Sequence, residues 1–294
     1  MLLLSLSLRQ RFFVAMKAQR PYSLMRWKAV REKGLVLMRN KALQMIYPLL
    51  GVAAFLLIWQ LFAAYVVSAG WLLPTPLAVL GSIVKNLDLL LRHSRYTAIE
   101  SMLGLLLSVL LSLLLAGLLS LSKRLSQMIY PLLLMSQMIP IVVLAPLFLI
   151  WFGYGMLPKA LVVILICFFP MVINILAGLN AVSREMLAYY QAMGMSRAQQ
   201  FSRLRLPYAL PYFFGGLRVS AAYSVMGAVI GEWLGAEGGL GFLLTRAQRS
   251  FDLPLVFAAI VSIIILSALI FLLVYVGEYL ALGWKRAESE QKWN

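Results

Sequence analysis

Residues 188–211 read AYYQAMGMSRAQQFSRLRLPYALP, a polar and basic stretch in an otherwise apolar chain. Of the 294 residues, 63% are hydrophobic and only 12% are charged. A soluble domain of ordinary composition carries about twice that share of charged residues. The stretch is therefore predicted to be a structured loop between two membrane spans, and the rest of the sequence is interpreted outward from it.

Long apolar blocks on both sides of this stretch predict a helical membrane protein. A helix needs about 20 apolar residues to cross the hydrocarbon core, and backbone facing lipid must satisfy its hydrogen bonds internally. Six blocks have this length: 46–67, 97–120, 129–151, 159–180, 212–234 and 256–282. The expected fold is an all-α integral membrane protein with six transmembrane helices, in a membrane domain that covers residues 46–284.

The 26 Lys and Arg residues are unevenly divided between the two sets of loops. Ten of them precede the first span, between Arg9 and Lys41, and 20 in all fall on the side that holds the 181–211 loop and the tail 285–294. Because basic loops stay in the cytoplasm during insertion, that loop and both termini are expected to be cytoplasmic. The net charge of +16 thus reflects topology, and no nucleic-acid partner is expected.

Residues 1–45 form a separate basic segment ahead of the membrane domain. Apolar residues such as Phe12, Phe13 and Trp27 are interspersed with its bases, which favours an amphipathic helix lying on anionic lipid. A topogenic tail without fixed structure is an equal alternative. The opening MLLLSLSL precedes the basic cluster, which is the wrong order for a secretory signal.

Side chains typical of catalysis or metal binding are scarce. The single cysteine, Cys167, falls in the fourth span and is interpreted as an apolar filler, and a lone thiol cannot form an internal disulfide or a zinc cluster. The single histidine, His93, is placed in a short loop and expected to be solvated. We therefore expect no enzymatic activity, metal or cofactor in this chain.

The segment after the first span is not expected to continue as a helix. Pro74 and Pro76 interrupt it, because proline lacks the amide hydrogen that a helix interior needs. Apolar residues then recur at helical spacing over residues 77–91. This pattern predicts a surface helix lying across the outer face.

Prolines beside polar side chains mark the third and fourth spans. Pro140 and Pro146 are expected to kink the third span. Broken helices with polar neighbours are common where a substrate passes through a membrane protein, although bundles without that role have them too. The candidate path residues are Ser136 and Gln137, before the first kink, and Asn174, near Pro170 in the fourth span.

The fifth span carries small and polar residues on one helical face: Ser220, Tyr223, Ser224, Gly227 and Gly231. Gly227 and Gly231 form a GxxxG pair, which lets two backbones approach closely. The stripe can be a packing seam between helices, or it can line a pore or a dimer axis. On the second interpretation, Ser220, Tyr223, Ser224 and Gly227 are candidate path residues.

Glu232 follows this stripe at the rim of the bundle, where a carboxylate must be hydrated or paired. It is a candidate path residue as a gate or substrate contact, and a structural cap or ion pair is the alternative. The glycine-rich GAEGGLGFLL of residues 235–244 comes next and predicts a short outer turn or a re-entrant piece. It lacks the Lys and Ser/Thr of a phosphate-binding loop.

The stretch that opens this section predicts two short helices on the cytoplasmic face. Ser183 can cap a first helix that extends to Met193, and Gly194 suits a left-handed stop. Ser196 can cap a second helix that extends to about Leu206. Pro207 and Pro211 are then expected to turn the chain back into the fifth span.

The first of these helices exposes apolar side chains on a polar loop: Met186, Tyr189, Tyr190 and Met193. Exposed aromatic and methionine side chains are typical of partner surfaces. Packing against the protein's own inner face is the alternative.

The same segment resembles the cytoplasmic signature of bacterial ABC-importer permeases. Gly194 is followed, after nine residues, by Leu204, Arg205, Leu206 and Pro207, which matches the family's glycine, apolar residue and Leu-Pro at their usual spacing. Other blocks resemble the family in the expected order: LLPTP at 72–76, IPIVVLAPLFLIWFGYG at 139–155 and GEWLGAEGGLGFLL at 231–244. The resemblance covers about residues 45–285. One departure is that the Glu-Ala-Ala usual before the glycine is replaced by Ala188, Tyr189 and Tyr190.

This resemblance implies a type I ABC importer permease of the bacterial inner membrane. Two copies would form a pore, a cytoplasmic ATPase dimer would bind ATP and Mg²⁺, and an extracytoplasmic binding protein would deliver the solute. The residues implied in coupling to the ATPase are Met186, Tyr189, Tyr190, Gln191, Gly194, Arg197 and Pro207.

The chain looks closest to the family branch that serves sulfonates, taurine, nitrate and thiamine-related pyrimidines. Two blocks, LVVILICFFPMVIN and VIGEWLGAEGGLG, look most like permeases for thiamine precursors of the hydroxymethylpyrimidine type. The same machinery for aliphatic sulfonate, taurine, nitrate or riboflavin is the alternative. An ion-coupled secondary transporter is the alternative class, although such carriers usually show an internal repeat and ionisable residues near mid-membrane.

Overall fold

The computed structural model describes residues 46–66, 73–235 and 237–283. The predictions for the basic segment 1–45 and for the tail 285–294 lie outside the described residues. The chain divides into two compact units, Met1–Ser68 and Ala69–Asn294.

The described part of the first unit is one apolar helix, Ile46–Tyr65. Its last turn is a π-helix, η1 (Phe62–Val66). With 20 residues it is long enough to cross the hydrocarbon, which confirms the first predicted span.

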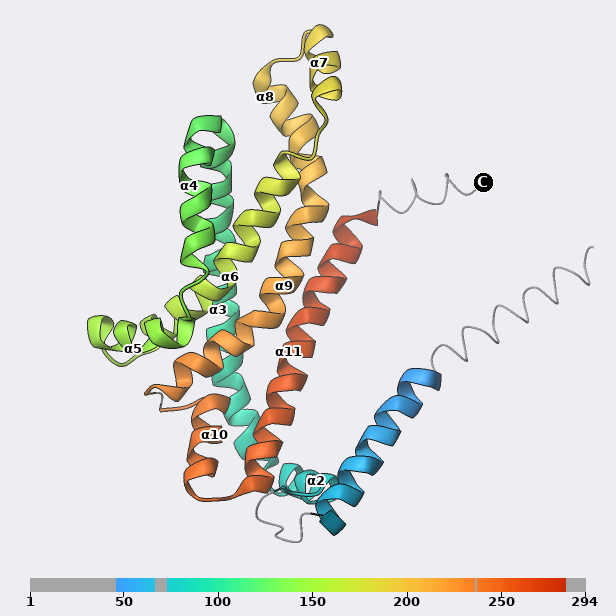
Figure 1. The fold of residues 1–294 in the computed structure, drawn as a ribbon, viewed down its shortest axis with the longest axis vertical. Helices are drawn as coiled ribbons and strands as arrows, with labels where there is room; N and C mark the ends of the chain where they lie inside the picture. The colour runs from blue at the N-terminus through green and yellow to red at the C-terminus, as the bar shows by residue number, and fades with distance from the viewer. Residues whose placement is uncertain (1–45, 67–72, 236, 284–294) are drawn as a thin grey trace, which may run out of the picture. The chain divides into compact units, whose positions relative to one another are not determined.

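The second unit is built from helices throughout its described residues (Figure 1). In chain order these are α2 (Pro76–Lys85), α3 (Leu87–Leu121), α4 (Lys123–Ser136), α5 (Ile141–Phe152), α6 (Met156–Leu179), α7 (Arg184–Ala192), α8 (Arg197–Gln200), η2 (Phe201–Arg205), α9 (Leu206–Trp233), α10 (Leu240–Arg249) and α11 (Leu253–Ala281). The long helices α3, α6, α9 and α11 are apolar enough to span a membrane. They confirm the second, fourth, fifth and sixth predicted spans.

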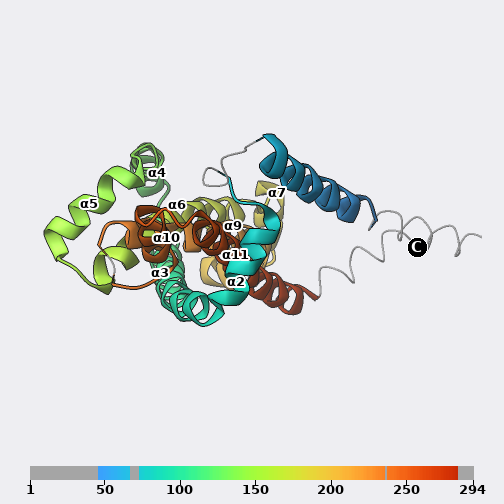
Figure 2. The same ribbon diagram turned by 90° about the horizontal axis from the view of Figure 1, so that it is seen from below.

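The long helices run between two ends of this unit, and shorter helices gather at each end. Helices α7 and α8 lie at one end, and α2 and α10 lie at the other (Figure 1). Seen along the unit from the α2 and α10 end, α5 projects sideways from the bundle (Figure 2). Segments that are distant in sequence therefore lie at the same end of the unit.

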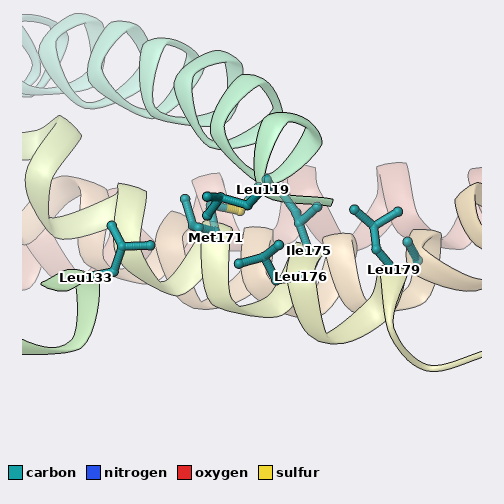
Figure 3. Close-up of a cluster of buried hydrophobic side chains, with 9 residues drawn as sticks. Leu119, Leu133, Met171, Ile175, Leu176 and Leu179 are labelled. Atoms are coloured by element: carbon teal, nitrogen blue, oxygen red, sulfur yellow. The ribbon is translucent and has the colours of Figure 1, made fainter. Parts of the chain in front are cut away.

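Helices α6 and α9 form the central contact of the bundle, and glycines of α9 make it close. A Cβ atom at Gly227 would lie 3.0 Å from Val163 Cα, and one at Gly216 would lie 2.9 Å from Asn174 Cβ. A second contact joins α3, α4 and α6 through Leu119, Leu133, Met171, Ile175, Leu176 and Leu179 (Figure 3). Cys167 is fully buried in a further cluster beside Val163 and Val225, as expected of an apolar filler.

The third predicted span is broken rather than kinked. Helix α4 ends at Ser136 and α5 begins at Ile141, and their axes differ by 95°. Pro140 is the N-cap residue of α5 in an extended conformation. Because proline cannot donate the hydrogen bond that would continue α4, the chain leaves the helix in a turn before it. Pro146, in contrast, lies inside α5.

The surface helix predicted over residues 77–91 is divided between two elements. Asn86 ends α2, and the next residue begins α3, which continues into the membrane span. His93 therefore lies in a helix and is only 7% exposed. The predicted solvated loop histidine is wrong, because the span begins ten residues earlier than its apolar block.

Pro207 and Pro211 do not turn the chain. Helix continues without a break from Arg197 to Trp233 through α8, η2 and α9. Pro207 closely follows the π-helical turn η2, and a widened turn of this kind can accommodate a residue that has no amide hydrogen. The π-helical turn η2 precedes it, and Leu206 N donates to Phe201 O. The loop helix and the fifth span are thus one element.

Candidate functional site

The segment between α6 and α9 is a helical hairpin whose caps match the sequence prediction. Ser183 Oγ accepts a hydrogen bond from Met186 N at 3.2 Å and caps α7. Gly194 adopts φ +83 directly after α7, a conformation that favours glycine. Ser196 Oγ accepts from Gln199 N at 3.3 Å, and Gln199 Oε1 accepts from Ser196 N at 2.9 Å. This capping box fixes the start of α8.

The outer face of the hairpin carries exposed apolar side chains. No residue of α7 is buried, and Tyr189 and Met193 are each 64% exposed. The rings of Tyr189 and Tyr190 meet edge to face with centroids 5.5 Å apart. Of the other predicted coupling residues, Met186 is half-buried, and Gln191, Gly194 and Arg197 are exposed. A surface of this kind can be covered by a protein partner.

Pro207 is separated from the other coupling candidates. It lies in the first turn of α9, beyond the hairpin itself. Because α8, η2 and α9 form one continuous helix of 37 residues, the second arm of the hairpin and the bundle core belong to a single helical element.

A cavity of 360 Å³ lies where α4, α5, α6 and α9 meet. It brings together Ser136 and Gln137, at the end of α4, and Tyr223, on α9. Its remaining lining residues are Ile139, Pro140, Ile141, Leu144, Leu165, Ile166, Phe169, Pro170 and Met226. All of these side chains are uncharged. Three of the eight predicted path residues thus share one apolar cavity beside the α4–α5 break.

Ser220 and Gly227 lie outside this cavity, in the contact between α6 and α9, and Ser224 also lies outside it, with its Oγ donating to Ala221 O within α9. Both serines are fully buried. Ser220 Oγ donates to Cys167 O at 2.9 Å, across the two helices. For these residues the stripe is a packing seam, which is one of the two interpretations left open by the sequence. Tyr223, at the edge of the stripe, is 45% exposed and turns toward the cavity.

Asn174 also belongs to the α6–α9 contact. Its Nδ2 donates to Pro170 O at 2.8 Å within α6, and its Cβ faces Gly216 of α9. The side-chain amide thereby bonds to a carbonyl in the proline-containing turn, and the residue does not line the cavity.

Glu232 is the centre of a buried polar cluster and is 1% exposed. Its Oε1 accepts a hydrogen bond from Thr97 Oγ1 at 2.7 Å, and its Oε2 accepts from Gly241 N at 2.6 Å. Thr97 Oγ1 in turn accepts from Leu240 N at 2.8 Å. The carboxylate thus ties α9 to α3 and to the start of α10. This is the cap that the sequence offered as an alternative to a gate.

Two further residues complete the attachment of the glycine-rich loop. His93 Nδ1 accepts from Gly239 N at 3.0 Å. Gly239 has φ +110, and a Cβ there would overlap the Glu232 carboxyl group. Only glycine fits this position, which explains one glycine of the GAEGGLG run.

A buried ion pair lies close to the same cluster. Lys159 Nζ and Glu100 Oε1 are 2.6 Å apart, with side chains 12% and 5% exposed. The pair joins α3 to the first turn of α6, and a Cβ atom at Gly231 of α9 would lie only 3.0 Å from Lys159 Cα. The sequence analysis did not predict this pair, although Lys159 is the first residue of the fourth predicted span. A carboxylate inside an apolar span, at Glu100, was the available signal.

These features define a class of protein: a multi-pass α-helical membrane protein, with a cavity among its helices and a surface hairpin that continues into one of them. The chain belongs to the family described as the binding-protein-dependent transport system inner membrane component, whose model matches residues 108–280. It is therefore a permease subunit of an ABC importer. This membership decides against the ion-coupled carrier that the sequence left as an alternative class.

The names of similar permeases state different transported solutes. The chain is 36% identical to the formylaminopyrimidine transport permease protein ThiX of Halalkalibacterium halodurans over 85% of this chain and 100% of the relative. It is 34% identical to the riboflavin transport system permease protein RibX of Chloroflexus aurantiacus, over 81% of this chain and 91% of the relative. It is 29% identical to the taurine transport system permease protein TauC of Escherichia coli, over 74% of this chain and 82% of the relative.

Proposed function

We propose that this permease carries a neutral, planar heterocycle, and that a thiamine pyrimidine precursor of the hydroxymethylpyrimidine type is its cargo. The observation that carries the proposal is the cavity of 360 Å³, whose lining is uncharged and includes the Tyr223 ring. An aromatic side chain can stack on a heterocycle at no cost in charge desolvation. The similarity to a formylaminopyrimidine permease agrees with this choice.

A sulfonate or nitrate would lack a charged partner in this cavity. Burying an anion without a compensating group is costly, which disfavours taurine and aliphatic sulfonates here. Riboflavin stays the second candidate, because it is also planar and uncharged and because a riboflavin permease is among the relatives.

The transport cycle is proposed to run through the hairpin. A cytoplasmic ATPase dimer, which would bind ATP and Mg²⁺, docks on the exposed face around Tyr189 and Met193. Its closure moves α7, and the continuous helix passes this movement to the wall of the cavity at Tyr223. Two copies of the chain would enclose the path and alternate between inward and outward access.

The remaining partners follow from the same arrangement. An extracytoplasmic binding protein would deliver the cargo at the end of the bundle opposite the hairpin. Both termini and the hairpin would face the cytoplasm, as the excess of basic residues on that side indicates.

The cargo is tested by uptake into proteoliposomes that contain the permease, its ATPase and its binding protein. Hydroxymethylpyrimidine uptake is expected to depend on ATP, and taurine uptake is expected to stay at background. Tyr223→Ala should lower pyrimidine uptake by about five- to twelvefold if stacking contributes about 1–1.5 kcal/mol, and Tyr223→Phe should retain it. Uptake of taurine or riboflavin in preference to the pyrimidine would show that the cargo assignment is wrong.

A further inference from the structure

The turn between α10 and α11 holds a large side chain in a strained backbone conformation. Phe251 has φ +57, the only non-glycine residue in the described part of the chain with a positive φ. Phe251 N donates to Gln248 O at 3.1 Å, and Asp252 N donates to Ala247 O at 3.0 Å. This pattern is a helix C-terminal motif in which the left-handed position is normally a glycine. Phenylalanine there is strained, because its Cβ crowds the backbone.

The strain is not offset by packing within the chain. Phe251 is 82% exposed, so its ring gains little from burial. Its neighbours Ser250 and Asp252 are polar and exposed, so this turn is unlike the apolar helix surfaces that face lipid. Non-glycine residues in this conformation concentrate at sites of function. The Phe251 ring is therefore exposed on the surface and contributes little to the stability of the fold.

Exposed arginines surround this end of the bundle. Arg246 and Arg249 are exposed on α10, and Arg92 and Arg95 are exposed at the start of α3. Arg92 and Arg246 both lie close enough to His93 to interact with it electrostatically, so the two helices bring their bases together. Exposed acids here are Asp88, Glu237 and Asp252, and Asp252 Oδ1 is engaged in capping α11 through Leu255 N. The bases are in excess.

The surface is also held in place from beneath. The Glu232, Thr97 and His93 contacts fix the start of α10 on α3 and α9. The turn after α10 lies at the end of the unit where α2 is also found (Figure 1). A pre-formed surface loses little freedom when a partner binds, which suits it to repeated, reversible docking.

We propose that Phe251 and the arginines at 92, 95, 246 and 249 form the docking surface for the extracytoplasmic binding protein. The complementary partner surface would be an apolar pocket rimmed by carboxylates, because an aromatic anchor and arginines are the groups that dominate protein interfaces. This inference rests on the proposed function, which places this end of the bundle outside the cell.

The test measures how strongly the binding protein stimulates ATP hydrolysis by the permease–ATPase complex in nanodiscs, across a range of binding-protein concentrations. The Phe251→Gly change should raise the binding-protein concentration needed for half-maximal stimulation at least tenfold. The apparent melting temperature of this variant should stay equal to or above that of the wild type. The stability readout is decisive, because glycine relieves the backbone strain. Arg246→Gln with Arg249→Gln should weaken stimulation and flatten its dependence on salt.

Gln248→Ala, an exposed change on the same helix, is the matched control and should behave as the wild type. The inference fails if the binding-protein concentration that half-stimulates the Phe251→Gly complex is within twofold of the wild-type value. It also fails if that variant melts at a lower temperature than the wild type. It also fails if the variant instead changes the oligomeric mass or the response to anionic lipid, since the occupant would then be a second copy or the membrane. If no binding protein stimulates the wild-type complex, the proposed function fails, and this docking surface fails with it.

Discussion

Glu232 is a residue whose role depends on partners that are far away in the sequence. Its two carboxylate oxygens accept hydrogen bonds from Thr97, 135 residues away, and from Gly241, nine residues away. The sequence could show a carboxylate beside a glycine run, and it allowed either a gate or a cap. It could not show that Thr97 and His93, on another helix, face the same loop. Long-range polar pairing of this kind leaves no local pattern.

Removing the Glu232 carboxylate should destabilise the protein. In Glu232→Ala the Gly241 amide loses its acceptor in a buried site, at about 1–3 kcal/mol for an unsatisfied group, whereas the Thr97 hydroxyl keeps the His93 carbonyl oxygen as an acceptor at 3.3 Å. We expect a clear fall in the apparent melting temperature of the purified permease in detergent, and a smaller fall for Glu232→Gln, which retains one acceptor oxygen. The matched control is Glu237→Gln, because Glu237 is exposed. A Glu232→Ala variant that melts like the wild type would contradict the structural role.

At the scale of elements, length and hydropathy predicted the spans, and local capping chemistry predicted the hairpin. Ser183, Gly194 and Ser196 act as the sequence indicated, because caps depend only on neighbours in the chain. The prolines were the weaker guide. Pro140 separates two helices that lie 95° apart, whereas Pro207 is accommodated in the first turn of α9. Which outcome occurs depends on the surrounding packing and on the π-helical turn η2, and neither is visible locally.

The continuous helix predicts that transport depends on stiffness between the hairpin and the core. Ser202 and Arg203 are exposed within η2, so replacing them should disturb no packing. Ser202→Gly with Arg203→Gly weakens the helix by about 1 kcal/mol for each glycine relative to alanine. We expect this pair to lower the number of cargo molecules moved per ATP severalfold, while Ser202→Ala with Arg203→Ala retains it. Equal coupling in the two variants would mean that the hairpin does not act as a lever.

At the scale of the whole molecule, the second unit places three features at different points along its length. The hairpin stands at one end, the uncharged cavity lies beside the broken span, and the clamped α10 lies at the other end. Helix α9 takes part in all three, through its junction with η2, through Tyr223 and through Glu232. The Arg218–Glu278 pair, at 3.1 Å, also joins α9 to α11. We therefore propose that movement applied at the hairpin reaches both the cavity and the opposite surface through α9.

This arrangement predicts that the two ends face opposite sides of the membrane. The test introduces a cysteine separately at Ser196, on the hairpin, and at Gln248, on α10, because both positions are exposed. The native Cys167 is fully buried and should give little background labelling. A membrane-impermeant thiol reagent applied to intact cells is expected to label the cysteine at 248 and to leave the one at 196 unlabelled until the membrane is permeabilised. The unmodified chain is the control for background. Labelling at 196 in intact cells would place the hairpin outside, where no cytoplasmic ATPase could reach it, and the coupling scheme would then be wrong.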